Sequence, residues 1–525
     1  MWQNLRKTNA AGAYILKTCG NCIRQTRATA ASSHSSAVGR EERFILFEYS
    51  EKKTARLYSE VRSLVLPQVY SGIFLTMLCS ILLSSCAALA AAARSGGGIQ
   101  AKPIVRGVRA YGATETAPPI ITRTPQSVFG SITPASSSSN EVPSVIGSSF
   151  VTIEVDVQCA VPPAFAVALV HCDASWQEDK NFVLNDPTTT RITQIQIFQA
   201  NSFSRHFTHR ALFTVPNSEV QLRFSGNWKA KIFDTDDMTT PLGEARFFVV
   251  DQEAETSLSM IIDAYSPRIG GTSSSAYTLE AALNAPPQFT DENFHTVTLY
   301  RAWRWNEPLT ITQNLALGRT ETLYNRSSKA TVLGFSTAQK RFRLAGIPTE
   351  NEYRVLDIRD AMRFPASTAP LRFALADLRR NGIAFVQADD GAMMTSGVSA
   401  SSDEYVLMEF VLASEGAPSS REIFVVGSFN DWRVDNQWKM RYDPNLLQYT
   451  LTQWVRRGRH NYVYASGVVN AQTGAIEQYD YEECEGNSLS ANHTYYALFY
   501  YRNPQFGGFD ALLGVAARNT MRRNR

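Results

Sequence analysis

The chain has 525 residues, of which 44% are hydrophobic and 19% are charged, and its net charge is +3. At about 100–200 residues per domain, this length predicts three domains and excludes a single core, and the composition excludes global disorder. Residues 1–86 hold 11 of the 51 basic residues but only 5 of the 48 acidic ones. The near-neutral remainder argues against a nucleic-acid-binding protein, which needs a concentrated basic surface.

The uncharged run at 73–93 is long enough to span a bilayer, but its features favour a secretion signal. Arg62 precedes it, its strongly apolar part is short, and small residues follow. Within it, Leu83-Ser84-Ser85-Cys86 resembles the signal of bacterial lipoproteins, in which the cysteine receives lipid. We therefore assign 61–93 to a signal and lipoprotein segment and predict lipidation at Cys86. Cleavage after the alanines at the end of the run and a retained anchor are the alternatives.

Residues 1–60 fit no signal of this type, because a signal peptide begins with a short basic stretch. We interpret them as a possible non-native N-terminal extension, with the true start near Val61 or Val65. Residues 94–148 are rich in Ser, Gly, Thr and Pro and hold few bulky apolar side chains that could offset the entropy of ordering. They are predicted to form a flexible tether, with a random-coil reach of about 40 Å.

From Ser149 on, short runs of alternating apolar and polar residues predict strands separated by turns. The predicted fold class is all-β, with tandem β-sandwich domains of the immunoglobulin-like or early-set type behind the signal and the tether. The expected domains are an N-terminal sandwich, a middle β domain with a linker, a C-terminal early-set sandwich and a basic tail, at 149–251, 252–402, 403–517 and 518–525. We expect the strand Tyr495–Tyr501 to close the sheet of the third domain.

The cysteines that follow Cys86 are Cys159, Cys172 and Cys484. The first two flank a predicted hairpin connection, so they form either a disulfide or two buried free thiols.

The residues 149–517 contain no sequence motif that marks an enzyme, such as a P-loop, GxGxxG, HExxH, GxSxG or paired CxxC. We find no nucleophile, base and orienting group at usable spacing. His206 and His209 are three residues apart and would face opposite sides of a strand, so they could not share a metal ion. The sequence therefore predicts no enzyme, no catalytic residue, no metal and no cofactor.

Two stretches carry a resemblance beyond the fold class. The first is VHCDASW at 170–176, followed by LRFSGNWKAKIFD from Leu222 and ARFFVVD from Ala245. The second begins at Glu422 with EIFVVGSFNDW and continues through RGRHNYVYA and TYYALFYYRNP. Their order and spacing resemble the plug protein of the bacterial type IX secretion system, across 149–517.

This resemblance implies a non-enzymatic periplasmic subunit that closes the pore of the large outer-membrane β-barrel translocon while no cargo passes. It also implies attachment to the outer membrane by a lipid anchor and a Bacteroidetes-like host. A folded body on a tether suits this role, because it needs only a face that complements the mouth of a barrel.

The third domain also resembles the glycogen-binding module of starch-active enzymes and kinase regulatory subunits, through VVGSFNDW and the strands that follow. In sugar-binding relatives the Trp of this motif, here Trp432, is a stacking platform. Val463 stands where a Lys would complete the site, and no Trp follows Trp454. The alternative function is therefore a surface or periplasmic carbohydrate-binding lipoprotein, and the alternative role of Trp432 is packing at a sandwich edge.

Trp303 and Trp305 are the candidate anchors for the translocon. They lie two residues apart, on one face of a strand expected over Thr296–Trp303, beside Arg301 and Arg304. Trp and Arg are favoured where interfaces are strongest, and core packing is the alternative.

Overall fold

The computed structural model describes residues 102–123, 146–264, 275–313, 330–334, 339–373, 375–380, 390–414 and 417–520. The described residues all lie within Gln100–Arg525. The predicted extension, the signal segment and Cys86 lie outside them. Among the described residues, no helix is long and apolar enough to cross a membrane.

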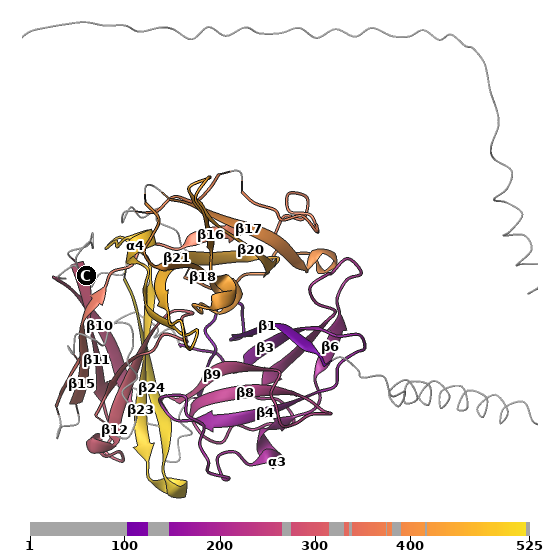
Figure 1. The fold of residues 1–525 in the computed structure, drawn as a ribbon. Helices are drawn as coiled ribbons and strands as arrows, with labels where there is room; N and C mark the ends of the chain where they lie inside the picture. Colours follow the sequence, from indigo (N-terminus) through magenta and orange to yellow (C-terminus); the bar gives the residue numbers. More distant parts are fainter. Residues whose placement is uncertain are drawn as a thin grey trace, which may run out of the picture. The chain divides into compact units, whose positions relative to one another are not determined.

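The described residues form six sheets, in which nearly every pair of neighbouring strands is antiparallel (Figure 1). The sheets are grouped around separate apolar cores, which confirms the predicted class of tandem β-sandwiches.

The first sandwich has two sheets with its core between them. The strands of one sheet are, in order across it, β1 (Ile104–Tyr111), β3 (Val151–Gln158), β7 (His209–Val215) and β6 (Gln196–Gln199). Those of the other sheet are β2 (Ile120–Arg123), β9 (Gly243–Asp251), β8 (Gly226–Asp234), β4 (Phe165–Cys172) and β5 (Arg191–Ile192). The one-turn helix α3 (Pro187–Thr190) follows β4. Successive side chains of β7 point to opposite faces of the sheet, so every second one is buried.

Two of these strands lie in the range predicted to be a tether, so that prediction is wrong for the described part, residues 102–123. Strand β1 pairs with β3, and β2 pairs with β9. Ile120 and Ile121 are buried, and Val105 and Val108 pack against the core of the first sandwich. The average composition of 94–148 concealed these short apolar runs, which have enough apolar surface to join a core that other residues build.

The second sandwich is built from two segments that are far apart in the chain. One sheet consists of β10 (Glu255–Ala264), β11 (Ser275–Asn284), β15 (Gln339–Pro348) and β14 (Ala330–Leu333). The other consists of β13 (Leu309–Thr312), β12 (Phe294–Arg301), β23 (Thr494–Asn503) and β24 (Phe509–Asn519). The 3-10 turns η2 (Asp291–Asn293) and η7 (Gln505–Gly507) precede β12 and β24.

The third sandwich is inserted between β15 and β23 and has its own core. One sheet consists of β16 (Arg354–Asp357), β21 (Arg459–Val469) and β18 (Glu422–Gly427), and β22 (Ile476–Asp480) also pairs with β21. The other consists of β17 (Tyr405–Ala413), β20 (Gln448–Arg456) and β19 (Arg441–Asp443). Its short helical elements are η4 (Ala400–Ser402), η5 (Ser428–Asn430), η6 (Asn436–Trp438) and α4 (Glu482–Glu485).

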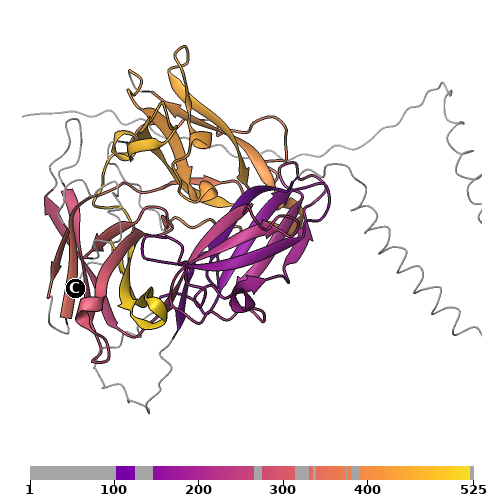
Figure 2. The same ribbon diagram turned by 60° about the horizontal axis from the view of Figure 1, so that its bottom comes forward.

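The strand expected at Tyr495–Tyr501 exists as β23, but it does not close the third sandwich. It pairs with β12 and β24, and Tyr495, Ala497 and Phe499 pack in the core of the second sandwich. Figure 2 shows this returning hairpin in yellow, next to the strands of the second sandwich. Strand β16, which the sequence analysis placed in the middle domain, pairs with β21 of the third.

The insertion gives a test with fragments. We expect residues 350–486 to fold alone and to unfold cooperatively on heating, because they contain all strands and the core of the third sandwich. A fragment 403–517 lacks β16 and carries β23 and β24 without their partner β12, so we expect it to aggregate or to lack a cooperative transition. Circular dichroism melts compare the two, and the reverse order of behaviour would contradict the inserted topology.

Candidate functional site

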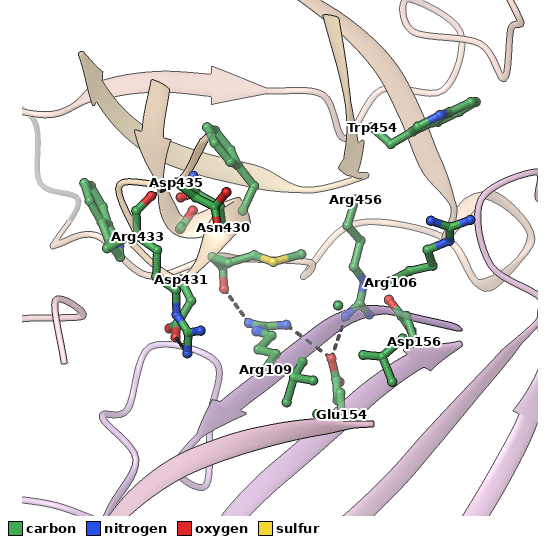
Figure 3. Close-up of a pocket in the computed structure, with 18 of the residues that line it drawn as sticks. Arg106, Arg109, Glu154, Asp156, Asn430, Asp431, Arg433, Asp435, Trp454 and Arg456 are labelled. Atoms are coloured by element: carbon green, nitrogen blue, oxygen red, sulfur yellow. Dashed lines mark hydrogen bonds and ion pairs between the residues drawn. The ribbon is translucent and has the colours of Figure 1, made fainter. Parts of the chain in front are cut away.

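A cavity of about 720 Å³ lies between the first and the third sandwich (Figure 3). Strand β1 lines it along one side, together with the side chains of Glu154 and Asp156 from β3. Tyr405, Trp454 and Arg456 of the third sandwich line it from the other side. It is therefore a place where residues from distant parts of the sequence meet.

Charged residues reach this cavity because strands alternate. Val151, Ile153, Val155 and Val157 of β3 point into the core of the first sandwich, so Glu154 and Asp156 point out of it. Arg210 points out of the same sheet from β7. Tyr405 and Arg456 lie opposite each other on the paired strands β17 and β20. The third sandwich covers the outward face of β3, which leaves both faces of that strand largely buried.

The residues form a continuous network of ion pairs across the cavity wall. The Arg456 Nη1 atom lies 2.6 Å from Glu154 Oε2, and its Nη2 atom lies 3.3 Å from Asp403 Oδ2. Arg210 Nε lies 2.5 Å from Asp156 Oδ1, and Arg210 also pairs with Asp403. Because each arginine contacts carboxylates of both sandwiches, the network joins the two.

Three further side chains contact these carboxylates. Arg109 of β1 lies 3.6 Å from Glu154 and 3.1 Å from Glu115. Tyr111 donates a hydrogen bond of 2.9 Å to Glu154, and Tyr405 donates one of 2.9 Å to Asp156. Such a buried set is stable only while it is complete, because removal of one partner leaves a buried charge without compensation.

The network is charged at neutral pH. Burial alone would raise the pKa of Glu154, but the guanidinium groups of Arg456 and Arg109 outweigh it and lower that pKa to about 2. Burial likewise opposes ionisation of Asp403, and Arg456 and Arg210 lower its pKa below the ordinary value.

The HCDxxW motif at 171–176 lies at a second interface, between the first and the second sandwich. His171 is fully buried, with Nδ1 2.6 Å from Asp179 Oδ2 and Nε2 3.0 Å from the Ser225 carbonyl oxygen. Trp176 donates from its indole N–H to the hydroxyl of Tyr300 at 3.1 Å. This motif therefore holds two sandwiches together.

Cys172 of this motif is buried in the same interface, and Cys159 is half-buried. Both are free thiols, as is Cys484. Burial raises the pKa of the Cys172 thiol to about 12. Among the described residues, no group of His, Cys, Asp and Glu side chains is arranged to hold a metal ion.

The two tryptophans predicted as translocon anchors do not lie together on a strand face. Strand β12 ends at Arg301, and Trp303 follows in a turn with a positive φ of 64°. Trp303 is half-buried and lines the cavity, whereas Trp305 is buried against Phe248 and Tyr300. A Trp with positive φ cannot be recognised from the sequence, so the predicted strand was extended past Arg301 to Trp303. Their role in binding a partner remains a prediction.

Trp432, the predicted carbohydrate platform, is only 2% exposed. Its indole N–H donates to the Gly391 carbonyl oxygen at 3.1 Å, and the guanidinium of Arg304 lies 5.0 Å from its ring centroid. Arg304 also lies over the rings of Tyr353 and Tyr481 and pairs with Glu350 at 2.8 Å. The ring of Trp432 therefore packs between sandwiches and offers no face to a sugar.

The residues of the charged network were missed by the sequence analysis. Glu154, Arg210, Asp403 and Arg456 lie on four separate strands or loops, and no local pattern links them. The only signal was Glu154 and Asp156 at the polar positions of an otherwise apolar strand, which is also the pattern of an exposed strand face.

Comparisons with known proteins find a family model that matches part of the chain. Residues 132–251 match the family model described as the type 9 secretion system plug protein 1st domain. Residues 132–251 are thus similar to the first domain of type 9 secretion plug proteins. The match confirms the resemblance found in the sequence and supports a plug-like role. It also points to a non-enzymatic, envelope-associated protein that associates with a secretion translocon.

The solved structures show the fold. The crystal structure of a hypothetical protein from Parabacteroides merdae aligns with 79% of this chain and 97% of its own, at a TM-score of 0.58 and 17% identity. A structure of Escherichia coli alpha-2-macroglobulin activated by porcine elastase aligns at a TM-score of 0.14 and 10% identity, over 78% of this chain and 30% of its own, and does not share the fold at this score. A search of curated proteins gave no match.

The lowered pKa of Glu154 predicts a pH-dependent stability. The folded state holds the ionised carboxylate more strongly than the unfolded state, whose pKa is near 4.5. The stabilisation is therefore present above pH 4.5 and is lost as the pH falls towards about 2; a shift of this size corresponds to about 3 kcal/mol. We expect Glu154→Gln to lower the free energy of unfolding at pH 7 and to flatten its decline between these pH values, as measured by chemical denaturation.

The matched control is Glu422→Gln, which breaks an exposed pair with Lys439 at 3.6 Å and should change stability by less than about 1 kcal/mol. Equal effects of the two substitutions at pH 7 would show that the network does not join the sandwiches.

Proposed function

We propose that this chain is the periplasmic subunit that closes the outer-membrane translocon pore of the type 9 secretion system while no cargo passes. The observation that carries the proposal is the plug-domain match over residues 132–251. The proposed location is the periplasm, with attachment to the outer membrane. The partner is the large β-barrel of the translocon.

The contacts between sandwiches support this role, because a body that blocks a pore must not deform when the pore presses on it. An apolar interface with Trp176, Phe248 and Tyr300 joins the first sandwich to the second. The charged network joins the first to the third, and the aromatic surroundings of Arg304 join the second to the third. Each sandwich is thus fixed to both others by buried side chains.

For the attachment, we propose that Cys86 carries the lipid. Strand β1 begins at Ile104, so only residues 87–103 would separate the lipid from the folded body. Even fully extended, this segment reaches at most about 60 Å. The body would therefore stay close to the membrane, where the mouth of a barrel lies.

The decisive experiment is a pull-down of the full chain from native outer membranes. We expect a very large β-barrel as the main partner. Trp303→Ala should weaken its recovery while thermal unfolding stays cooperative, because Trp303 is half-buried and follows the end of β12. Truncation of a Trp at the centre of an interface typically weakens binding about 30-fold or more. Phe203→Ala, an exposed aromatic of the first sandwich, is the matched control. Absence of a barrel from every preparation would refute the proposed function.

Lipidation is tested by mass spectrometry of the mature N-terminus. We expect a peptide that begins with diacylated Cys86. An unmodified peptide that begins at Arg94 would refute the anchor, and so would an intact segment 1–86.

The burial of Trp432 argues against the carbohydrate-binding alternative. A sugar stacks on an exposed ring, and Trp432 is buried between Arg304 and Tyr353. If the protein were retained on an α-glucan column and Trp432→Ala lost this retention while still folded, carbohydrate binding would be supported.

A further inference from the structure

Two loops from distant parts of the sequence place apolar side chains in solvent at one point of the surface. One loop follows β4 and exposes Phe182 and Val183, which are 70% and 46% exposed. The other joins β23 to β24 and exposes Phe506, which is 52% exposed. Asn181 donates a hydrogen bond from its side chain to the Phe506 carbonyl oxygen, so the loops are in contact. We call these three apolar residues the loop tip.

Contacts with neighbouring residues fix the conformation of the loop tip. Leu184, next to Val183, is buried in the core of the second sandwich. The side chain of Asn181 also accepts a hydrogen bond of 2.9 Å from the backbone N–H of Val183. The ring of Phe224 packs against that of Phe506, with centroids 5.4 Å apart. The exposed rings are therefore presented by fixed loops.

The backbone conformation of the hairpin directs the side chain of Phe506 into solvent. Phe506 has a φ of 53°, which a bulky side chain rarely adopts, and it is followed by Gly507 and Gly508 with φ of 84° and 91°. Pro504 precedes the turn. This sequence turns the chain so that an aromatic ring projects from the end of a hairpin.

Basic side chains lie near the loop tip, and two of the nearby acids are engaged in pairs. Lys180 is exposed and makes no ion pair within the described residues, and Arg223 and Arg502 are exposed near the same two loops. By contrast, Asp179 pairs with His171 at 2.6 Å, and Asp510 is buried and pairs with Arg502 at 3.0 Å. The surface around the rings therefore favours anionic groups.

The size of the loop tip decides between a bilayer and a protein as its partner. A fully buried aromatic ring removes about 150–250 Å² from water, so at these exposures the loop tip offers about 300 Å² of apolar surface. A stable protein–protein interface needs about 800 Å² from each partner. Projecting aromatic rings with basic neighbours instead match the interface of a bilayer, where the rings enter the acyl boundary and the cations meet phosphate.

We propose that Phe182, Val183 and Phe506 insert into the interface of a bilayer that contains anionic phospholipid, with Lys180, Arg223 and Arg502 contacting its phosphates. This contact does not rest on the proposed function, because it requires no translocon. It would orient the body relative to the membrane surface.

The test uses the full chain with vesicles of phosphatidylethanolamine and phosphatidylglycerol, in comparison with vesicles of phosphatidylcholine alone. In Phe506→Trp, a tryptophan reports on the loop tip itself, so binding through any other part of the chain does not produce the signal. We expect its emission, after subtraction of the parent protein, to shift to shorter wavelength with the anionic vesicles and to be quenched by brominated lipid.

The matched control is Phe203→Trp, at a position that is 73% exposed in the loop between β6 and β7. We expect no shift from it. A shift in both variants, or in neither, would overturn the proposal, and so would a shift of Phe506→Trp that appears only with an isolated barrel protein in detergent.

A second measurement uses sedimentation with the same vesicles. The double variant Phe182→Ser with Phe506→Ser should bind the anionic vesicles at least about tenfold more weakly, because burial of one Phe is worth about this factor. Phe203→Ser should bind as the parent does. Thermal unfolding of all variants should match that of the parent, because each changed side chain is exposed. Unchanged binding of the double variant would overturn the proposal.

Discussion

The pairing of β12 with β23 is the constraint on which the arrangement of the described residues depends. It joins residues about two hundred positions apart, and every side chain of β12 is buried. Val297 and Leu299 face the core of the second sandwich, and Tyr300 packs against the first. The third sandwich occupies the chain between the two strands and brings its ends together when it folds. It thereby lowers the entropy that closing so long a loop would otherwise cost.

The two interfaces of the first sandwich differ because its two sheets present different outer faces. The sheet with β8 and β9 presents Phe248 and Val250, which meet rings and aliphatic side chains of β12, β23 and β24. The sheet with β3 and β7 presents Glu154, Asp156 and Arg210, which can be covered only by a surface with matching charges. Arg456 and Asp403 supply them, although the desolvation of these buried charges offsets much of the energy gained from their contacts. The apolar interface therefore contributes most of the adhesion, and the charged one fixes the orientation.

Local patterns predicted local structure well. The short strands predicted from Ser149 on are found, for example as β3 and β17. What depends on distant partners could not be predicted. Ile120 and Ile121 read as part of a tether because their partner β9 lies more than a hundred residues away. The sequence around Glu154 does not indicate that its partner is Arg456, which lies 302 positions further along the chain. The family motif was visible in the sequence, whereas its structural task, the interface between two sandwiches, became clear only from the contacts of His171 and Trp176.

The GSFNDW motif of the third sandwich shows how one sequence pattern can serve different ends. Asp431 and Trp432 both have positive φ, near 54° and 55°, so the chain turns tightly and directs the indole inward. There the ring meets the guanidinium of Arg304, whose charge is balanced by Glu350 and Glu307. A tryptophan that stacks on sugar must keep one face in water, and a tryptophan that holds a buried arginine cannot. The choice between the two roles is made by residues outside the motif, above all by Arg304, and no comparison of the motif alone could decide it.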